Sequence, residues 1–90
     1  MKTIRFSDHA NERILKRKLD EDLVKRVVQN PMQIVPDEEN ENRKIYQSFF
    51  IDRKGKEKLL RVVVEETDME FVIISGYPTS QINKYWRKDL

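Results

Sequence analysis

Residues 43–65 read RKIYQSFFIDRKGKEKLLRVVVE, two runs rich in β-branched and aromatic residues on either side of Gly55. Such runs favour strands, and residues 53–55 form a three-residue hairpin loop with the glycine at its left-handed position. Closing this hairpin places Arg61 opposite Gln47. Apolar side chains then alternate onto one face of the two strands, which we expect to pack against helices: Tyr46, Phe50, Leu60, Val62 and Val64.

Two helices are predicted on the N-terminal side of the hairpin. Ser7 is a good N-cap for a helix that runs to about Lys18. Asp20 is a second N-cap, and the helix after it carries apolar residues at helical spacing. The residue before a proline avoids helical backbone angles, so Asn30-Pro31 ends this second helix.

Further strands and a short last helix complete the prediction. Residues 70–77 favour a strand, residues 32–35 an edge strand, and residues 3–6 a brief first strand. After Pro78, a Thr or Ser can cap a last helical turn or two. We therefore predict one α+β domain over residues 1–90, with two N-terminal helices packed on one face of an antiparallel three- to four-stranded sheet and a short C-terminal helix.

The composition of the 90 residues excludes several kinds of chemistry. There is no cysteine, which excludes disulfides, thiolate zinc sites and a cysteine nucleophile. One histidine excludes an all-histidine metal site within a monomer, and we expect neither a metal nor another cofactor. The longest apolar run is the four residues 71–74, far below the roughly 18 needed to span a bilayer. We expect no membrane segment, no secretory signal and a cytoplasmic location.

The charges are nearly balanced in number but separated along the chain. The formal net charge is +2, yet residues 31–42 hold four acidic and no basic residues, and residues 43–61 hold seven basic and two acidic ones. Such blocks can present a basic face on a nearly neutral molecule. The alternative is that each block is an ordinary solvated surface.

Cations on two elements form the first candidate site. His9, Arg13 and Arg17 recur every four residues along the first helix and suit an anion that needs both binding and proton transfer. Arg61 is expected in the middle of the sheet face left open by the helices, as a clamp for a phosphate or carboxylate. The alternatives are a cap or surface histidine, and an arginine that pairs with Glu65 or with water.

The C-terminal stretch adds hydroxyl, aromatic and basic groups. Thr79 follows the last predicted strand, and residues 84–88 read KYWRK. Aromatic residues interleaved with basic ones suit nucleic acids, through stacking and phosphate contacts. Docking of Tyr85 or Trp86 on the core is the alternative.

The chain also resembles a small bacterial and phage family of domains of unknown function, which is grouped by fold with RelE/ParE-like toxins in the barnase/EndoU/colicin/RelE ribonuclease superfamily. Residues 73–85 are similar to the end of BrnT-type toxins. The resemblance lies in five groups of residues: Phe6-Ser7-Asp8-His9-Ala10, Arg13 with Arg17, Asn30-Pro31, Leu60-Arg61-Val62-Val63-Val64, and Ile73-Ile74-Ser75-Gly76-Tyr77-Pro78-Thr79.

The resemblance implies a single RelE-like domain that acts as a metal-independent endoribonuclease, on free or ribosome-associated RNA, with an antitoxin protein as partner. It implies a catalytic set of five residues, His9, Arg13, Arg61, Thr79 and Tyr85. His9 would transfer one proton, the arginines would hold the scissile phosphate, and the two hydroxyls would orient it. The second proton would come from Tyr77, from Tyr85 or from water. Two alternatives are a non-catalytic module that binds RNA or protein through a basic sheet face, and an interaction domain that closes its open face by homodimerisation.

Overall fold

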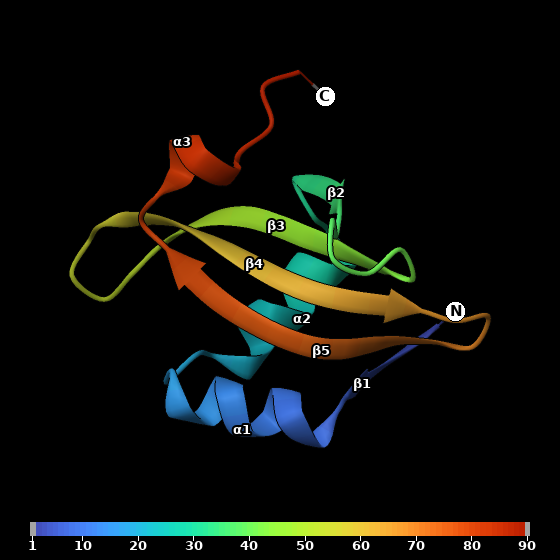
Figure 1. Cartoon of the computed structure of the whole chain (residues 1–90). Helices are drawn as coiled ribbons and strands as arrows, with labels where there is room; N and C mark the ends of the chain where they lie inside the picture. The colour runs from blue at the N-terminus through green and yellow to red at the C-terminus, as the bar shows by residue number, and fades with distance from the viewer. Residues whose placement is uncertain (1, 90) are drawn as a thin grey trace.

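A computed structural model describes residues 2–89. These residues form a five-stranded sheet with three helices (Figure 1). Their order along the chain is β1 (Thr3–Phe6), α1 (Asp8–Lys16), α2 (Glu21–Gln29), β2 (Gln33–Pro36), β3 (Arg43–Ile51), β4 (Glu57–Glu66), β5 (Glu70–Thr79) and α3 (Ile82–Tyr85).

The sheet has the strand order β1-β5-β4-β3-β2 and is mixed, because β1 runs parallel to β5 while the other neighbours are antiparallel. The predicted α+β class is confirmed, but the prediction of a purely antiparallel sheet of three to four strands is wrong. The four-residue strand β1 pairs only with residues 70–73 of β5. Beyond Ile73, β5 is therefore an edge strand, and an edge position tolerates Pro78.

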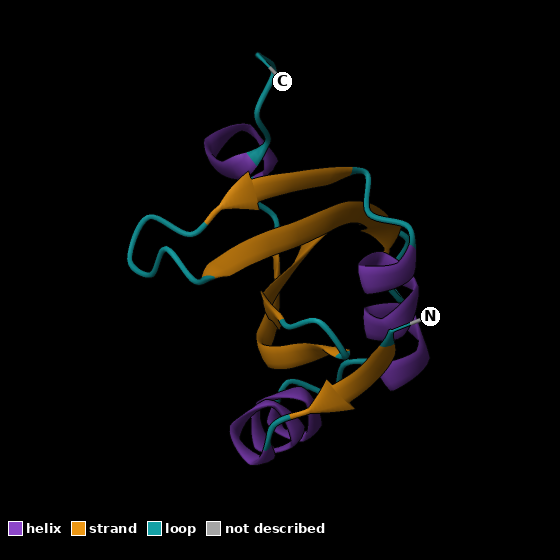
Figure 2. Cartoon of the chain, turned by 90° about the vertical axis from the view of Figure 1, so that its right-hand side faces the viewer, coloured by secondary structure: helices purple, strands orange, loops and turns teal. Residues whose placement is uncertain are grey.

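The β3–β4 hairpin has the predicted register. Arg61 lies opposite Gln47, and Gly55 has a φ of +78° in the connecting loop. The face with Leu60 and Val62 packs against α1 and α2, as predicted. Figure 2 shows the sheet strongly bent, with α3 apart from the other two helices. The core includes these buried residues: Ala10, Ile14, Val24, Val27, Val28, Tyr46, Leu60, Val62, Val64 and Ile73.

Both predicted N-caps are confirmed. The Ser7 hydroxyl accepts a hydrogen bond from the Ala10 N–H, and the Asp20 carboxylate accepts one from the Asp22 N–H. The first helix ends at Lys16, two residues earlier than predicted, because Lys18 takes a left-handed conformation with φ 52°.

Lys18 occupies the position that helix ends of this type usually give to glycine. The Lys18 and Leu19 N–H groups donate to the carbonyls of Leu15 and Ile14, at 3.1 and 3.0 Å. These are the two hydrogen bonds of a Schellman motif, and Leu19 packs against the core cluster that contains Ile14. The lysine Cβ strains the backbone at this point.

Replacing Lys18 by glycine should therefore raise the free energy of unfolding by about 0.5–1 kcal/mol, because it removes this strain at a modest cost in chain entropy. Urea unfolding followed by circular dichroism measures the change. The control is Lys18→Ala, which removes the ammonium but keeps the Cβ and should give no gain. A glycine variant no more stable than the alanine variant would contradict the expectation.

The C-terminal segment crosses to the sheet face opposite α1 and α2. The prediction that a Thr or Ser caps the last helix is wrong, because Gln81 is the residue at the N-cap position of α3. The Thr79 hydroxyl instead accepts a hydrogen bond from the Gln81 N–H at 3.0 Å, in the turn before the helix. The Trp86 ring then packs on Phe49 with 4.5 Å between ring centroids. None of the helices in residues 2–89 has the length and apolar character needed to cross a membrane.

Candidate functional site

Arg61 is buried, which corrects the expectation that it lies exposed on an open sheet face. Only 7% of the residue is accessible. Its expected partner Glu65 pairs instead with Arg43, at 3.7 Å. Among residues 2–89, no carboxylate forms an ion pair with Arg61. A buried guanidinium without a counterion is unusual, because burial of an unpaired charge is costly.

Neutral groups hold the Arg61 guanidinium in place. Its Nε donates to the Gln47 Oε1 at 2.9 Å, and its Nη1 donates to the Tyr77 hydroxyl at 2.6 Å. The Tyr85 ring lies 4.1 Å from the guanidinium carbon, measured to the ring centroid. Tyr77 is 5.8 Å away by the same measure and meets Tyr85 edge to face. The Tyr85 ring favours the cation through its π face, whereas Tyr77 meets the guanidinium at its hydroxyl.

Gln47 connects this cluster to the C-terminal segment. It is completely buried, and its Nε2 donates to the Gln33 Oε1 at 2.8 Å and to the Tyr85 carbonyl at 3.2 Å. Gln33 in turn accepts the Arg87 N–H at 3.1 Å. Since a fully satisfied buried network is rigid, these bonds fix α3 over one end of the sheet and orient Arg61.

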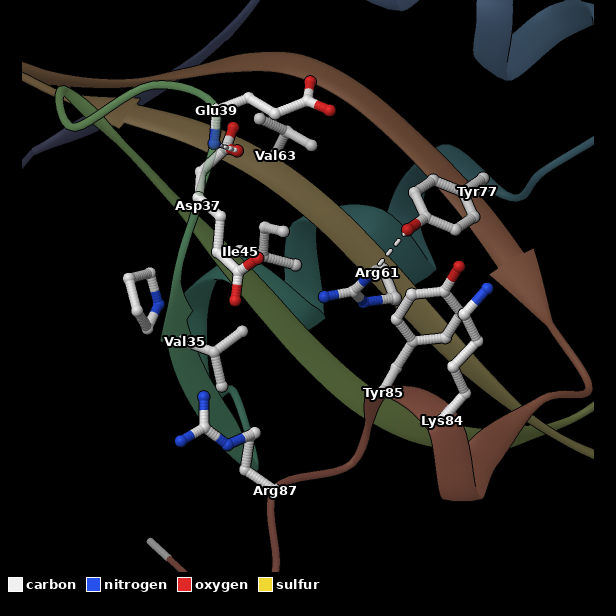
Figure 3. A pocket seen from close by; sticks show the side chains of 12 residues that line it. Val35, Asp37, Glu39, Ile45, Arg61, Val63, Tyr77, Lys84, Tyr85 and Arg87 are labelled. Carbon is white, nitrogen blue, oxygen red and sulfur yellow. Dashed lines mark hydrogen bonds between the residues drawn. The ribbon is translucent and has the colours of Figure 1, made fainter.

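The remaining part of this sheet face is a cleft of about 510 Å³ with Arg61 at its floor. We call it the Arg61 cleft (Figure 3). Tyr77, Lys84 and Tyr85 line one wall, and acidic residues of the β2–β3 loop line the other. Its lining residues are Val35, Pro36, Asp37, Glu38, Glu39, Ile45, Arg61, Val63, Tyr77, Lys84, Tyr85 and Arg87.

The cations of the Arg61 cleft differ in how they are neutralised. Arg87 donates two hydrogen bonds to the Asp89 carboxylate, both 3.2 Å long, and this contact raises the pKa of Arg87 and lowers that of Asp89. Within residues 2–89, Lys84 has no carboxylate partner, and neither does Arg61. The Arg61 Nη2 makes no hydrogen bond to these residues. The wall formed by Arg61, Lys84 and the tyrosines is therefore able to bind an anion.

The structure brings together two of the five predicted site residues, Arg61 and Tyr85. His9 and Arg13 are exposed on α1 and do not line the Arg61 cleft. Thr79 ends β5, and its hydroxyl is engaged by the turn before α3. The proposed catalytic roles of these residues stay predictions.

Sequence reasoning did not place Gln47 in the site, and it offered Tyr77 only as an alternative to Tyr85 for the second proton-transfer role. For Gln47 a signal was present, because an uncharged polar residue opposite Arg61 in a strand pair is a natural hydrogen-bond partner. For the position of Tyr77 opposite Arg61 there was none. A register shift between Val63 and Val64 moves β5 by one residue, and only this shift puts Tyr77 opposite Arg61.

Comparisons with known proteins give one family. No curated protein and no solved structure matches the chain. A family model described as a domain of unknown function (DUF4258) matches residues 6–78, from the last residue of β1 to Pro78 of β5, and thus includes Arg61 and Tyr77. The chain therefore belongs to the DUF4258 family.

Proposed function

We propose that this protein binds single-stranded RNA in the Arg61 cleft, as a RelE-like ribonuclease of the toxin type. The observation that carries the proposal is the buried Arg61 guanidinium, which has no counterion among residues 2–89. A ligand anion would supply the missing charge. The planar guanidinium matches the geometry of a phosphate, and fixed neutral partners hold it ready for that contact.

The surroundings of Arg61 favour a nucleic acid over a free phosphate ion. Tyr77 and Tyr85 are partly exposed on the wall beside it, where bases of a single strand can stack. Lys84 adds a second cation on the same wall, and it too has no carboxylate partner within residues 2–89. The volume of about 510 Å³ is that of a site for a ligand much larger than one phosphate.

Cleavage is the second part of the proposal, and the acidic wall of the cleft favours it. Asp37 and Glu39 lie on the wall opposite the tyrosines (Figure 3). The Asp37 carboxylate accepts the Glu39 N–H at 3.0 Å and so stabilises its own loop, whereas the Glu39 carboxylate makes no hydrogen bond to residues 2–89. Glu39 is therefore our choice for the general base.

In the proposed reaction, Glu39 accepts the proton of the ribose 2′-hydroxyl. The 2′-oxygen then forms a bond to phosphorus while the bond to the 5′-oxygen breaks, which leaves a 2′,3′-cyclic phosphate. The Tyr77 hydroxyl would donate a proton to the leaving 5′-oxygen, because it accepts a hydrogen bond from Arg61 and its own hydrogen is free to be donated. Arg61 would also stabilise the charge that develops on the phosphate.

Incubation of a labelled oligouridylate with the protein in EDTA tests both parts. We expect saturable binding and products that end in a cyclic phosphate. Glu39→Gln should keep the RNA affinity and slow cleavage by about 10²- to 10⁴-fold. The matched control is Glu41→Gln in the same loop, outside the cleft lining, which should cleave normally. His9→Ala, assayed beside them, measures the contribution of the predicted histidine.

Two results would contradict the proposal. RNA that saturates the protein but yields no product would exclude cleavage and leave a binding module. RNA that does not bind at all would exclude both parts.

A further inference from the structure

A second concave surface lies at the end of the molecule where the α1–α2 connection meets the β3–β4 loop, and we call it the basic groove. Its volume is about 790 Å³. Figure 1 shows the connection and the loop at the same end of the sheet. The lining residues are Arg17, Lys18, Leu19, Asp20, Leu23, Arg26, Phe50, Ile51, Asp52, Arg53, Lys54, Lys58 and Pro78.

The two acidic residues of the basic groove are already occupied by other contacts. Asp20 caps α2. Asp52 accepts the N–H groups of Lys56 and Lys54 at 2.9 Å each and pairs with the Lys58 ammonium at 3.1 Å. These contacts, the Lys56 N–H first, lower the pKa of Asp52 below its usual value. The carboxylate therefore stays charged near neutral pH but is directed to its own turn and to Lys58.

The other cations of the basic groove have no carboxylate partner among residues 2–89. They come from three separate elements, which the fold places around one concavity: Arg17, Lys18, Arg26, Arg53 and Lys54. Five unneutralised cations around a groove create a strong positive potential, because the low-dielectric walls concentrate the field. Such a surface attracts a polyanion.

Tyr77 and Arg17 connect the basic groove to the Arg61 cleft. The Arg17 Nη1 donates to the Gly76 carbonyl at 2.6 Å, and the guanidinium lies 5.9 Å from the centroid of the Tyr77 ring. The hydroxyl of the same tyrosine binds Arg61. Tyr77 lines the cleft on one face of the sheet, and its neighbour Pro78 lines the groove on the other face, so the two concavities lie on either side of the β5 edge. No strand covers β5 here, since β1 ends its pairing at Ile73.

We infer that a single RNA strand, held at Arg61 by one phosphate, continues over Tyr77 and Arg17 into the basic groove. This inference rests on the proposed function and defines its ligand as a strand several nucleotides longer than the Arg61 cleft can hold. In this path, Tyr77 offers a stacking surface between two arginines. Arg53 and Lys54 bind phosphates of the distant nucleotides.

The test compares the RNA affinity of a short oligouridylate, about four nucleotides, with that of a long one, about 16 nucleotides. Each is titrated at several salt concentrations. The variant combines Arg53→Gln with Lys54→Gln. Both residues are exposed in the β3–β4 loop, and the hydrogen bond from the backbone N–H of residue 54 to Asp52 does not depend on the side chain. The matched control combines Arg5→Gln with Lys2→Gln. It also removes one arginine and one lysine charge, but at the other end of the sheet, where Arg5 lies in β1 and Lys2 directly precedes it.

We expect the loop variant to bind the long strand more weakly and with a shallower salt dependence. Each lost phosphate contact should reduce the slope of log K against log salt by about 0.7, and two contacts by about 1.4. The short strand should bind the variant and the wild type equally. The control pair should bind both strands as the wild type does.

The failure of this path is distinguishable from the failure of the proposed function. Suppose that the short strand binds and that the loop variant binds the long strand with an unchanged salt slope. The path is then wrong, while the Arg61 cleft remains an RNA site. An acidic protein segment would then be the ligand to test at the basic groove. If neither strand binds the wild-type protein, the proposed function is wrong and the path fails with it.

Discussion

Replacing Arg61 by methionine should weaken binding of a short oligouridylate by about 10- to 100-fold. Hydrogen bonds to charged groups contribute roughly 1.5–3 kcal/mol, and each 1.4 kcal/mol corresponds to about tenfold in affinity. The methionine fills similar space beside Gln47 and Tyr85 without the charge. Arg61→Lys should give an intermediate loss, since lysine keeps the charge but lacks the planar fork. Fluorescence anisotropy with labelled RNA measures the effect.

The variant should remain folded, which makes the loss of affinity interpretable. Removing a buried charge without a counterion relieves its desolvation cost, which offsets the loss of the donor to the Gln47 Oε1 and to the Tyr77 hydroxyl. Arg5→Met is the matched control. It makes the same substitution at an exposed arginine of β1, which pairs with Glu70 of β5. Equal losses in the two variants would mean that Arg61 acts only through net charge.

Replacing Leu60 by alanine should lower the free energy of unfolding by about 2–5 kcal/mol. Leu60 is completely buried in the core between the sheet and the helices. The loss combines the transfer free energy of the deleted groups with the cavity that remains. In a domain whose total stability is about 5–15 kcal/mol, this is a large fraction. Urea unfolding followed by circular dichroism measures it.

Leu15→Ala provides the control for this experiment. Leu15 is 81% exposed on α1, so the same change in composition should alter the stability by no more than about 0.5 kcal/mol. Similar losses at positions 15 and 60 would contradict the assignment of the core face, and with it the assignment of Arg61 to the opposite face.

The β3–β4 hairpin and the helix starts could be predicted because their determinants are local. Alternating apolar residues and Gly55 define the hairpin register, and Ser7 and Asp20 satisfy the free N–H groups of their helices. The parallel pairing of β1 with β5 could not be predicted in this way. It joins four residues at the start of the chain to a strand more than sixty residues later, and nothing in those four residues specifies the partner.

The site was only partly predictable, for a related reason. Arg61 was expected on the sheet face opposite the helices, and it is there, but its burial depends on α3 and on the Gln47 network. The position of Tyr77 depends on the register shift between β4 and β5, where Ile74 of β5 is passed over in the pairing. Continuing the pairing of Glu66 with Phe71 without a shift would place Gly76 opposite Arg61 and turn Tyr77 to the other face.

The most direct test of the account is an NMR titration of the protein with a short oligouridylate, followed at the Arg61 Nε–H. This proton donates to the buried Gln47 Oε1 at 2.9 Å, so its exchange with water should be slow enough for detection. We predict a saturable shift of this signal and of the Tyr77 and Tyr85 rings, which weakens with added salt. Saturable shifts elsewhere, with the Arg61 Nε–H unchanged, would contradict the assignment of Arg61 as the RNA phosphate site.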